Sequence, residues 1–147
     1  MALNTDFVGR VYGPGEPYEV SRVKIADFAD AIGEPSELCR DAEAARQAGY
    51  PDVIAPPTFA VVLSMASARV VNDDPGLGLD YSMVVHGEQS FAHSRPLHAG
   101  DVVTSQSTIE SVRPVGSMTT LTTVTQIRTT GGEHVCTARS VLVERGA

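Results

Sequence analysis

Apolar residues recur at helical spacing near the start of the chain. Between residues 21 and 32 they occupy positions i, i+3, i+4 and i+7, namely Ile25, Phe28, Ala29 and Ile32. Positions at this spacing share one face of a helix. Ser21 precedes them, and its hydroxyl can accept a hydrogen bond from the first free amides of a helix. The pattern predicts a short amphipathic helix over residues 21–32.

Two more helices are predicted farther along. Asp41 can cap a short one whose body is residues 43–48 and whose end is marked by Gly49. The segment 57–71 is apolar on nearly all sides and begins with Pro57, a residue type tolerated at the first helical position because no N–H is needed there. A helix without a polar face has to be covered on most of its sides. The rest of the chain must supply that cover.

Four segments rich in β-branched residues follow and can supply it. They span residues 82–97, 100–115, 117–130 and 133–146. The interruptions between them are residues 96–101, the region of Pro114 and Gly116, and the pair Gly131-Gly132, which is typical of a two-residue hairpin. Because parallel strands need long crossovers, these short connections predict that the four strands form an antiparallel meander in chain order.

A single α+β domain over residues 1–147 accounts for these elements. A chain of 147 residues suits one domain, and no repeat, low-complexity tract or linker divides it. An antiparallel β-sheet wrapped around a central apolar helix is the hotdog fold, although the periodicity alone fits other α+β folds as well.

Charge and composition narrow the possible partners. The net charge of -7 repels nucleic-acid phosphates and anionic lipids, so neither nucleic acid nor a membrane is expected as a partner. A signal-peptide pattern and an apolar run of the roughly 20 residues that cross a bilayer are both missing, which predicts a cytoplasmic protein. The 2 cysteines are too few for a disulfide framework, and the 4 histidines lack metal-ligand spacing. Without a Gly-rich phosphate loop, no cofactor is expected either.

Three segments resemble the MaoC-like (R)-specific hydratases and dehydratases. Residues 33–59 are similar to that family's hydratase motif, in which an aspartate is followed five residues later by a histidine, and an Ala-rich helix and an Ile-Ala-His-Gly turn lead into the central helix. Residues 84–101 and 134–146 resemble a strand with its Pro-x-x-x-Gly-Asp turn and the terminal strand of the same family. With residues 1–12, the resemblance extends along essentially the whole chain. It implies a hotdog fold and is strongest to the non-catalytic HadA- or HadC-like subunits of actinobacterial 3-hydroxyacyl-ACP dehydratases.

The chain departs from the motif where that family's chemistry lies. Glu34 stands in place of the aspartate, Cys39 in place of the histidine, and Ala55-Pro56-Pro57 in place of Ala-His-Gly. A general base contributes about 10²–10⁴ to such a rate, and one donor to the enolate oxygen about 10²–10³. A free thiol with a pKa of about 8.5 is mostly protonated near neutral pH, and proline has no N–H to donate. The motif of this chain is therefore expected to be a poor catalyst.

The resemblance accordingly implies a subunit of an enzyme. This chain would shape the acyl pocket of a (R)-3-hydroxyacyl-thioester dehydratase or enoyl hydratase acting on acyl carrier protein or CoA thioesters. A HadB-like hotdog subunit, paired with it edge to edge in one continuous sheet, would supply the catalytic Asp and His. Two alternatives stay open: a self-sufficient homodimeric hydratase or thioesterase that uses Glu34 and His86, and a catalytically dead scaffold that binds an acyl ligand.

Several side chains are candidates for the site. Glu34 and His86 are candidate catalytic groups, against the simpler interpretations of a loop carboxylate and of a strand-edge or interface hydrogen bond. His86 opens the string His86-Gly87-Glu88-Gln89, which is typical of the non-catalytic subunits that the chain resembles. Candidate substrate-binding residues come from the turn, the central helix and this string: Pro57, Thr58, Phe59, Val62, Leu63 and Gly87.

The simpler interpretation of the apolar candidates is that they form the core. Apolar walls nevertheless suit a fatty chain, which gains about 0.8 kcal/mol for each buried methylene. Arg69, Arg95 and Arg113 are candidates to meet a phosphate of phosphopantetheine or CoA, although scattered surface arginines are the simpler interpretation.

Overall fold

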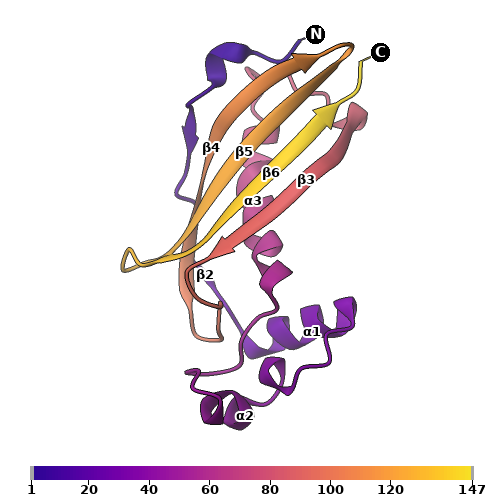
Figure 1. Ribbon diagram of the computed structural model, residues 1–147. Coiled ribbons are helices and arrows are strands. Elements are labelled where there is room, and N and C mark those ends of the chain that lie inside the picture. Colours follow the sequence, from indigo (N-terminus) through magenta and orange to yellow (C-terminus); the bar gives the residue numbers. More distant parts are fainter. Residues whose placement is uncertain (1, 147) are drawn as a thin grey trace.

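A six-stranded antiparallel sheet with one long helix along its face forms the body of the protein (Figure 1). The computed structural model describes residues 2–146, so Met1 and Ala147, the two ends of the expected domain, lie outside the described residues. The strands are β1 (Val11–Tyr12), β2 (Tyr18–Glu19), β3 (Val84–His93), β4 (Val102–Val115), β5 (Met118–Thr129) and β6 (His134–Glu144). They are ordered β1-β4-β5-β6-β3, and β2 also pairs with β4.

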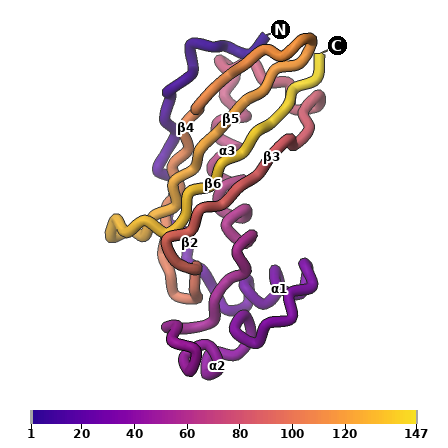
Figure 2. The backbone as a smooth tube through the Cα atoms, viewed as in Figure 1, coloured from indigo at the N-terminus to yellow at the C-terminus, as the bar shows by residue number. Residues whose placement is uncertain are grey.

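Three α-helices and four short 3-10 helices complete the fold. The α-helices are α1 (Arg22–Ile32), α2 (Ala42–Gln47) and α3 (Ala60–Asn72), and the 3-10 helices are Thr5–Phe7, Glu37–Cys39, Pro57–Phe59 and Tyr81–Met83. Helix α3 runs along the sheet, while α1 and α2 lie together beyond the start of α3, as the chain trace shows (Figure 2). This confirms the expected α+β arrangement of a sheet and a central helix. None of the helices in residues 2–146 is long and apolar enough to cross a membrane.

The helix signals in the sequence act at the positions expected. The hydroxyl of Ser21 accepts a hydrogen bond from Lys24 N at 3.1 Å at the start of α1. Asp41 caps α2 by accepting from two backbone amides, and Gly49 follows the helix with a φ of 95°. The expected apolar face of α1 is only partly buried, because Ile32 at the end of the helix is 50% exposed.

The strand order corrects the expected meander, in which β3 would lie beside β4. Strand β3 instead pairs with β6, at the opposite side of the β4-β5-β6 hairpins. The reason lies in residues 94–101, which do not turn tightly but cross the end of the sheet. Their backbone pairs with residues 53–55, where Leu97 O accepts from Ala55 N at 2.8 Å and Val53 O accepts from Ala99 N at 3.0 Å. Residues 53–55, which lie outside the sheet, therefore satisfy backbone groups of the crossing segment 94–101.

The hairpin turns also differ from the expectation. The connection at Gly131-Gly132 is a three-residue loop, closed by a bond from Thr129 N to Glu133 O at 2.9 Å. Only the last residue of that loop, Gly132, has a positive φ, 98°. The two-residue hairpin is instead Gly116-Ser117, between the paired residues Val115 and Met118, with a φ of 63° at Gly116. Glycine with positive φ at the first central position suits a type II′ turn.

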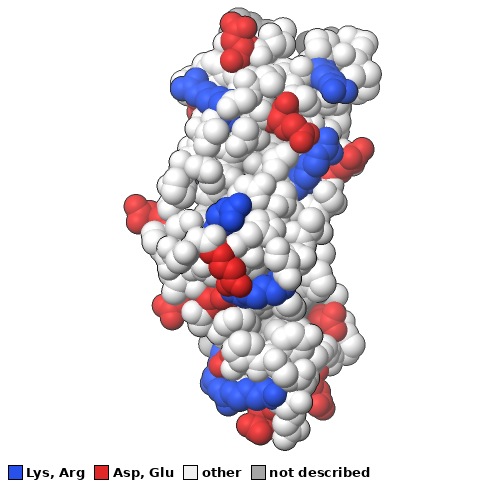
Figure 3. Space-filling model, turned by 60° about the vertical axis from the view of Figure 1, so that its left-hand side comes forward, with Lys and Arg blue, Asp and Glu red and all other residues white. Residues whose placement is uncertain are grey.

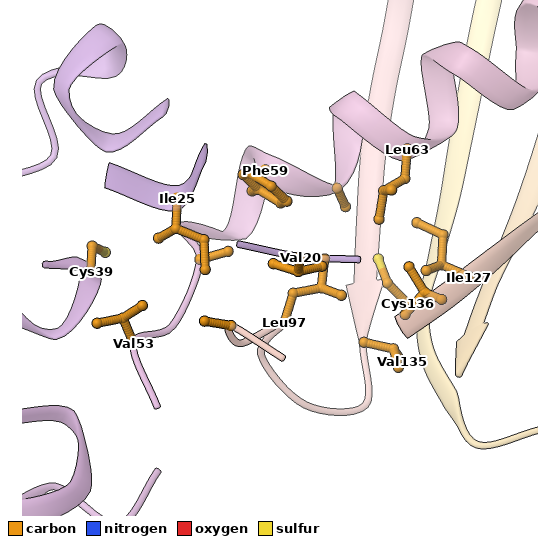
Figure 4. Packing of buried hydrophobic residues seen from close by; sticks show 14 of the residues in the cluster. Val20, Ile25, Cys39, Val53, Phe59, Leu63, Leu97, Ile127, Val135 and Cys136 are labelled. Carbon is orange, nitrogen blue, oxygen red and sulfur yellow. The ribbon is translucent and has the colours of Figure 1, made fainter. Parts of the chain in front are cut away.

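The core lies between α3 and the sheet and continues toward α1. Phe59, at the start of α3, is fully buried and meets Phe28 of α1 edge-on, with 5.4 Å between the ring centroids. Figure 4 shows Leu63 close to Ile127 and Cys136 of the sheet, while Phe59 lies nearer to Val20 and Ile25 in the same cluster.

The expectation that α3 is covered on most of its sides is wrong for the isolated chain. Met65 is 51% exposed and Val70 is 60% exposed, because the one sheet of residues 2–146 covers only one side of the helix. The chain by itself therefore leaves apolar helix surface in contact with water.

Candidate functional site

A cavity of about 600 Å³ lies between α3 and strands β3, β5 and β6. We call it cavity A. The α3 side chains that line it follow each other at helical spacing: Val61, Ser64, Met65, Ala68, Arg69 and Asn72. The sheet contributes Thr125, Ala138, Ser140 and Leu142 from β5 and β6, and His86 and Gln89 from β3. Cavities of this size and mostly apolar lining are typical of small-molecule sites.

A β-bulge at Gly87 directs both His86 and Gln89 into cavity A. His86 pairs with Leu142 and Glu88 with Val141, so Gly87 is an extra residue in β3. Side chains alternate between the two faces of a strand, and residues three apart would normally point to opposite faces. The extra residue resets the alternation, as bulges near functional sites do. A Cβ atom on Gly87 would lie 3.1 Å from Val143 Cγ2 and 3.3 Å from Val141 O, so a larger residue would require these neighbours to shift.

The two side chains on β3 differ in how firmly they are held. Gln89 Nε2 donates to the backbone oxygen of Arg139 on β6 at 3.1 Å, so its Oε1 is the atom left to accept from a ligand. His86 is exposed, and no carboxylate of residues 2–146 is hydrogen-bonded to its imidazole. His86 therefore lacks the partner that would orient it as a general base.

Cavity A is polar at one end. Val61 and Ala68 belong to its apolar part, whereas Arg69, Asn72 and Asp73 gather where α3 ends. Arg69 Nε and Asp73 Oδ2 are 3.4 Å apart at the exposed rim. The charged side chains of the lining are thus confined to one end, while hydroxyl and amide groups such as those of Ser64, Thr125 and Gln89 interrupt the apolar wall elsewhere.

A buried chain of hydroxyls crosses beneath α3 from the floor of cavity A. Thr125 Oγ1 is 2.8 Å from Ser107 Oγ, which is 2.7 Å from Ser67 Oγ. Ser107 and Thr125 are both almost fully buried. The hydroxyls satisfy one another, so they hold α3 to β4 and β5 without an unpaired polar group.

A second cavity of about 570 Å³, which we call cavity B, lies on the other side of α3. It is bounded by residues 12–18 and β4 and is lined from α3 by Val62, Leu63, Ala66, Ser67 and Val70. Ala66 borders both cavities.

The residues in the positions of the hydratase motif do not reach either cavity. Glu34 is half-buried, and its Oε1 accepts a hydrogen bond from Ser36 N at 3.0 Å, which fixes the carboxylate in its own loop. Cys39 is 3% exposed and belongs to the core cluster that contains Ile25 and Val53. Burial raises the pKa of the Cys39 thiol, and the negative charge of Glu34 raises it further, against a smaller opposite effect of Arg40. The thiol is thus neutral near pH 7 and cannot act as a base.

Backbone groups in the turn into α3 are also already hydrogen-bonded within the chain. Phe59 N donates to Pro56 O at 2.9 Å, and the oxygen of Pro57 lies 2.9 Å from His93 Nε2. Because a carbonyl only accepts, this nitrogen of His93 carries the proton. Pro56 and Pro57 have no N–H, and the amide of Phe59 already donates to Pro56 O. Few donors are therefore left in this turn for a developing oxyanion.

The candidate residues named from the sequence therefore do not lie together in one site. His86 lines cavity A, and Val62 and Leu63 line cavity B. Five others line neither cavity: Glu34, Pro57, Thr58, Phe59 and Gly87. Sequence reasoning missed Asn72 and Ser140, and it named Gln89 only as part of the string that begins at His86. Asn72 lies at helical spacing from Val61, which is the signal that could have found it. An asparagine at the end of a helix is, however, ordinarily explained by its preference for helix ends.

The arginines are used structurally or remain on the surface. Arg95 makes two bonds of 2.8 and 2.9 Å to the carboxylate of Asp101 and a third contact of 3.0 Å to Glu133. Burial alone would push the pKa of Asp101 upward, but the bonds from Arg95 and from the backbone amide of His98 lower it overall. This network anchors the crossing segment 94–101. Residues 2–146 contain no cluster of His, Cys, Asp and Glu that could hold a metal ion.

Charged residues of both signs are interspersed on the face seen in Figure 3. No single large patch of one sign covers that face, so its field is mixed despite the net charge of -7.

Comparison with known proteins relates this geometry to a family model. Residues 6–138 match the model described as "FAS1-like, dehydratase domain region". A UPF0336 protein of Thermobifida fusca is 54% identical over 146 residues, which cover 99% of this chain and 96% of the relative. A UPF0336 protein of Streptomyces coelicolor is 48% identical over 147 residues, covering 100% of this chain and 98% of the relative.

Solved structures agree with the family match. A MaoC-like dehydratase superposes with a TM-score of 0.88 and 30% identity, covering 96% of this chain and 43% of that longer one. This chain thus spans less than half of that protein. The C-terminally truncated HadBC (3R-hydroxyacyl-ACP dehydratase) complex from Mycobacterium tuberculosis gives a TM-score of 0.86 and 26% identity, covering 96% and 99% of the two chains. The expected hotdog fold and the MaoC-like resemblance are confirmed.

Proposed function

The chain belongs to the family described as the FAS1-like dehydratase domain region, and we propose that it is the subunit that shapes the acyl cavity of a (R)-3-hydroxyacyl-thioester dehydratase or enoyl hydratase. In this proposal the catalytic Asp and His come from a second, HadB-like hotdog chain. The present chain receives the acyl tail and completes the site from its own side of the interface.

The observation that carries the proposal is the burial of Cys39. The histidine position of the motif holds a neutral thiol inside the apolar core, and Glu34 is bound within its own loop. His86, the one imidazole on the wall of cavity A, is not paired with Glu34 or any other carboxylate of residues 2–146. Abstraction of the proton alpha to a thioester requires a base that is positioned and unprotonated, and these residues offer none.

The open edge of β3 supports pairing with a second chain. Strand β3 is 10 residues long and pairs only with β6 among the described residues. Its residues 85–90 are exposed, and an unpaired edge of this length is a template for another strand. Met65 is 51% exposed on the cavity A side of α3 and gives a partner at β3 additional apolar surface to cover. Similarity to a chain of the HadBC complex also favours a hotdog partner.

Edge-to-edge pairing would place the partner's helix favourably. When two antiparallel β3 strands pair about a two-fold axis, the helices on that face run in opposite directions side by side. The start of the partner's central helix then lies beside the end of α3, which is the polar end of cavity A. An acyl thioester held at the partner's Asp and His would extend its tail from there toward Val61.

Coexpression tests the proposal. The purified chain alone, a HadB-like hydratase alone and the copurified pair are assayed for hydration of crotonyl and longer enoyl thioesters. Turnover that requires the pair, together with elution of the pair as one species, is the expected result. Turnover by the isolated chain would instead support a self-sufficient homodimer, and tight acyl binding with no turnover in any sample would support a scaffold.

A further inference from the structure

A hydrogen-bonded series of side chains lies where β3 ends beside the start of β6, away from the linings of both cavities. Ser94 Oγ is 2.5 Å from His134 Nδ1, and His134 Nε2 is 2.8 Å from Thr137 Oγ1. Thr137 Oγ1 in turn donates to Gln126 Oε1 at 2.7 Å. Ser94 is exposed, whereas the other three side chains are half-buried. A serine hydroxyl, an imidazole and a polar group that orients the imidazole are the parts of a nucleophile with its base.

The backbone explains why these side chains share one face of the sheet. The register of β5 and β6 skips Val135, which is therefore an extra residue in β6. This β-bulge turns His134 to the same outer face as Thr137, although residues three apart normally point to opposite faces. Ser94 N donates to Val135 O at 2.8 Å, and this bond fixes the serine beside the imidazole.

The hydrogen bonds determine which nitrogen of His134 carries the proton. Gln126 Oε1 only accepts, so the hydroxyl proton of Thr137 points toward it. Thr137 Oγ1 must then accept from the Nε2–H of His134, which leaves Nδ1 unprotonated. The hydroxyl of Ser94 donates to this Nδ1. The imidazole is therefore in the form that removes a proton from Ser94.

The residue after the serine offers a donor for the charge that develops during acyl transfer. The backbone N–H of Arg95 lies outside the strands and donates to no backbone oxygen within residues 2–146. In α/β-hydrolases the N–H of the residue after the nucleophile is one of the oxyanion donors. The side chain of Arg95 is bound by Asp101 and Glu133. A phosphate group would meet these two carboxylates, whereas an uncharged ester meets no such repulsion.

We propose that Ser94 is a nucleophile, activated by His134, that accepts acyl groups from small uncharged esters. The Ser94 Oγ attacks the carbonyl carbon while its proton passes to His134 Nδ1. The new Oγ–C bond remains, the bond from that carbon to the leaving oxygen breaks, and the imidazolium returns the proton to the leaving group. Water then attacks the acyl-serine with the same base and releases the carboxylic acid.

This activity goes beyond the proposed function and is independent of it. Neither Ser94 nor His134 lines cavity A or cavity B, so the site has no room that would bury a long acyl chain. Small acyl groups are accordingly the expected substrates. Thr137 and Gln126 are positioning residues, because they hold the imidazole and do not touch the ester.

Reaction of the purified chain with p-nitrophenyl acetate tests the proposal. Release of p-nitrophenol gives the rate of acylation, and peptide mass spectrometry locates the acetyl group, which is expected on Ser94. Ser94→Ala should remove it, and His134→Asn, which keeps a polar side chain but no base, should slow acylation roughly 10²-fold. Ser90→Ala is the matched control and should change nothing, because Ser90 is an exposed serine on the same outer face of β3.

Two variants of Thr137 test its positioning role. Thr137→Val removes the acceptor for the Nε2–H of His134 and should slow acylation, whereas Thr137→Ser keeps that acceptor and should restore the wild-type rate. NMR of the imidazole nitrogens should show the proton on Nε2 in the wild type and in Thr137→Ser, and a loss of this preference in Thr137→Val.

Three results would overturn the proposal, once the melting temperatures of all variants verify folding. The first is acetylation confined to other residues such as Lys24. The second is acetylation of Ser94 at a rate that His134→Asn leaves unchanged. The third is release of p-nitrophenol that persists in Ser94→Ala, since the imidazole itself would then be the nucleophile. The assay needs no second chain, so its failure leaves the proposed function intact.

Discussion

The substitution Val61→Phe should shorten the acyl chain that the pair accepts. Val61 lines the end of cavity A at the start of α3, away from the polar end. Phenylalanine adds about four carbon atoms to this position, so a tail that reaches it loses burial for about four methylenes. At about 0.8 kcal/mol per methylene, the loss is about 3 kcal/mol, or roughly 100-fold in affinity. Tails too short to reach Val61 should bind as before.

The assay is kcat/KM for a series of enoyl thioesters of increasing length, measured with the copurified pair. Val62→Phe is the matched control, because the neighbouring residue makes the same change in volume but lines cavity B. A drop confined to the long substrates of Val61→Phe is expected, with an unchanged profile for Val62→Phe. The reverse pattern would place the tail in cavity B, and an unchanged profile for both variants would refute an acyl chain along α3.

Three further predictions follow from the contacts. Arg95→Ala should lower the free energy of unfolding by about 2–3 kcal/mol, measured by urea titration against Arg113→Ala. This is less than the loss of about 3–5 kcal/mol for a fully buried pair, because Arg95 is partly exposed. Since the folded pKa of Asp101 is lowered, its contribution to stability is complete above the unfolded pKa and disappears as the pH falls through the folded pKa; Asp101→Asn should flatten this acid limb in melting curves. Val85→Lys, on the open edge of β3, should reduce copurification of the pair without lowering the melting temperature of the isolated chain. Val115→Lys, at a hairpin end and 52% exposed against 41% for Val85, should leave copurification unchanged.

The helices could be predicted from the sequence because their signals are local. Ser21, Asp41 and Gly49 act within one turn of the backbone, and each has the expected position and contact. The strand segments were also predictable, since β-branched runs of this length are distinctive. The order of the strands in the sheet, by contrast, was predicted wrongly. The crossing of residues 94–101 depends on bonds to residues 53–55, and no local pattern encodes a pairing over that sequence distance.

The site was predictable only in part. The motif comparison pointed to Glu34 and Cys39, and the chemistry of a thiol suggested that the motif is inactive; its burial in the core adds the physical reason. The position of His86 and Gln89 on one wall could not be derived from alternation, because the bulge at Gly87 changes the face.

The substitution Glu34→Gln in the copurified pair tests the central claim most directly. If the partner supplies the acid and base, kcat for enoyl hydration should stay within about twofold of wild type, since Glu34 only accepts a bond from Ser36 in its own loop. Alanine in place of the partner's motif histidine should abolish turnover in the same assay. A fall of about 10²-fold or more with Glu34→Gln, the usual effect of losing a general acid or base, would contradict the account.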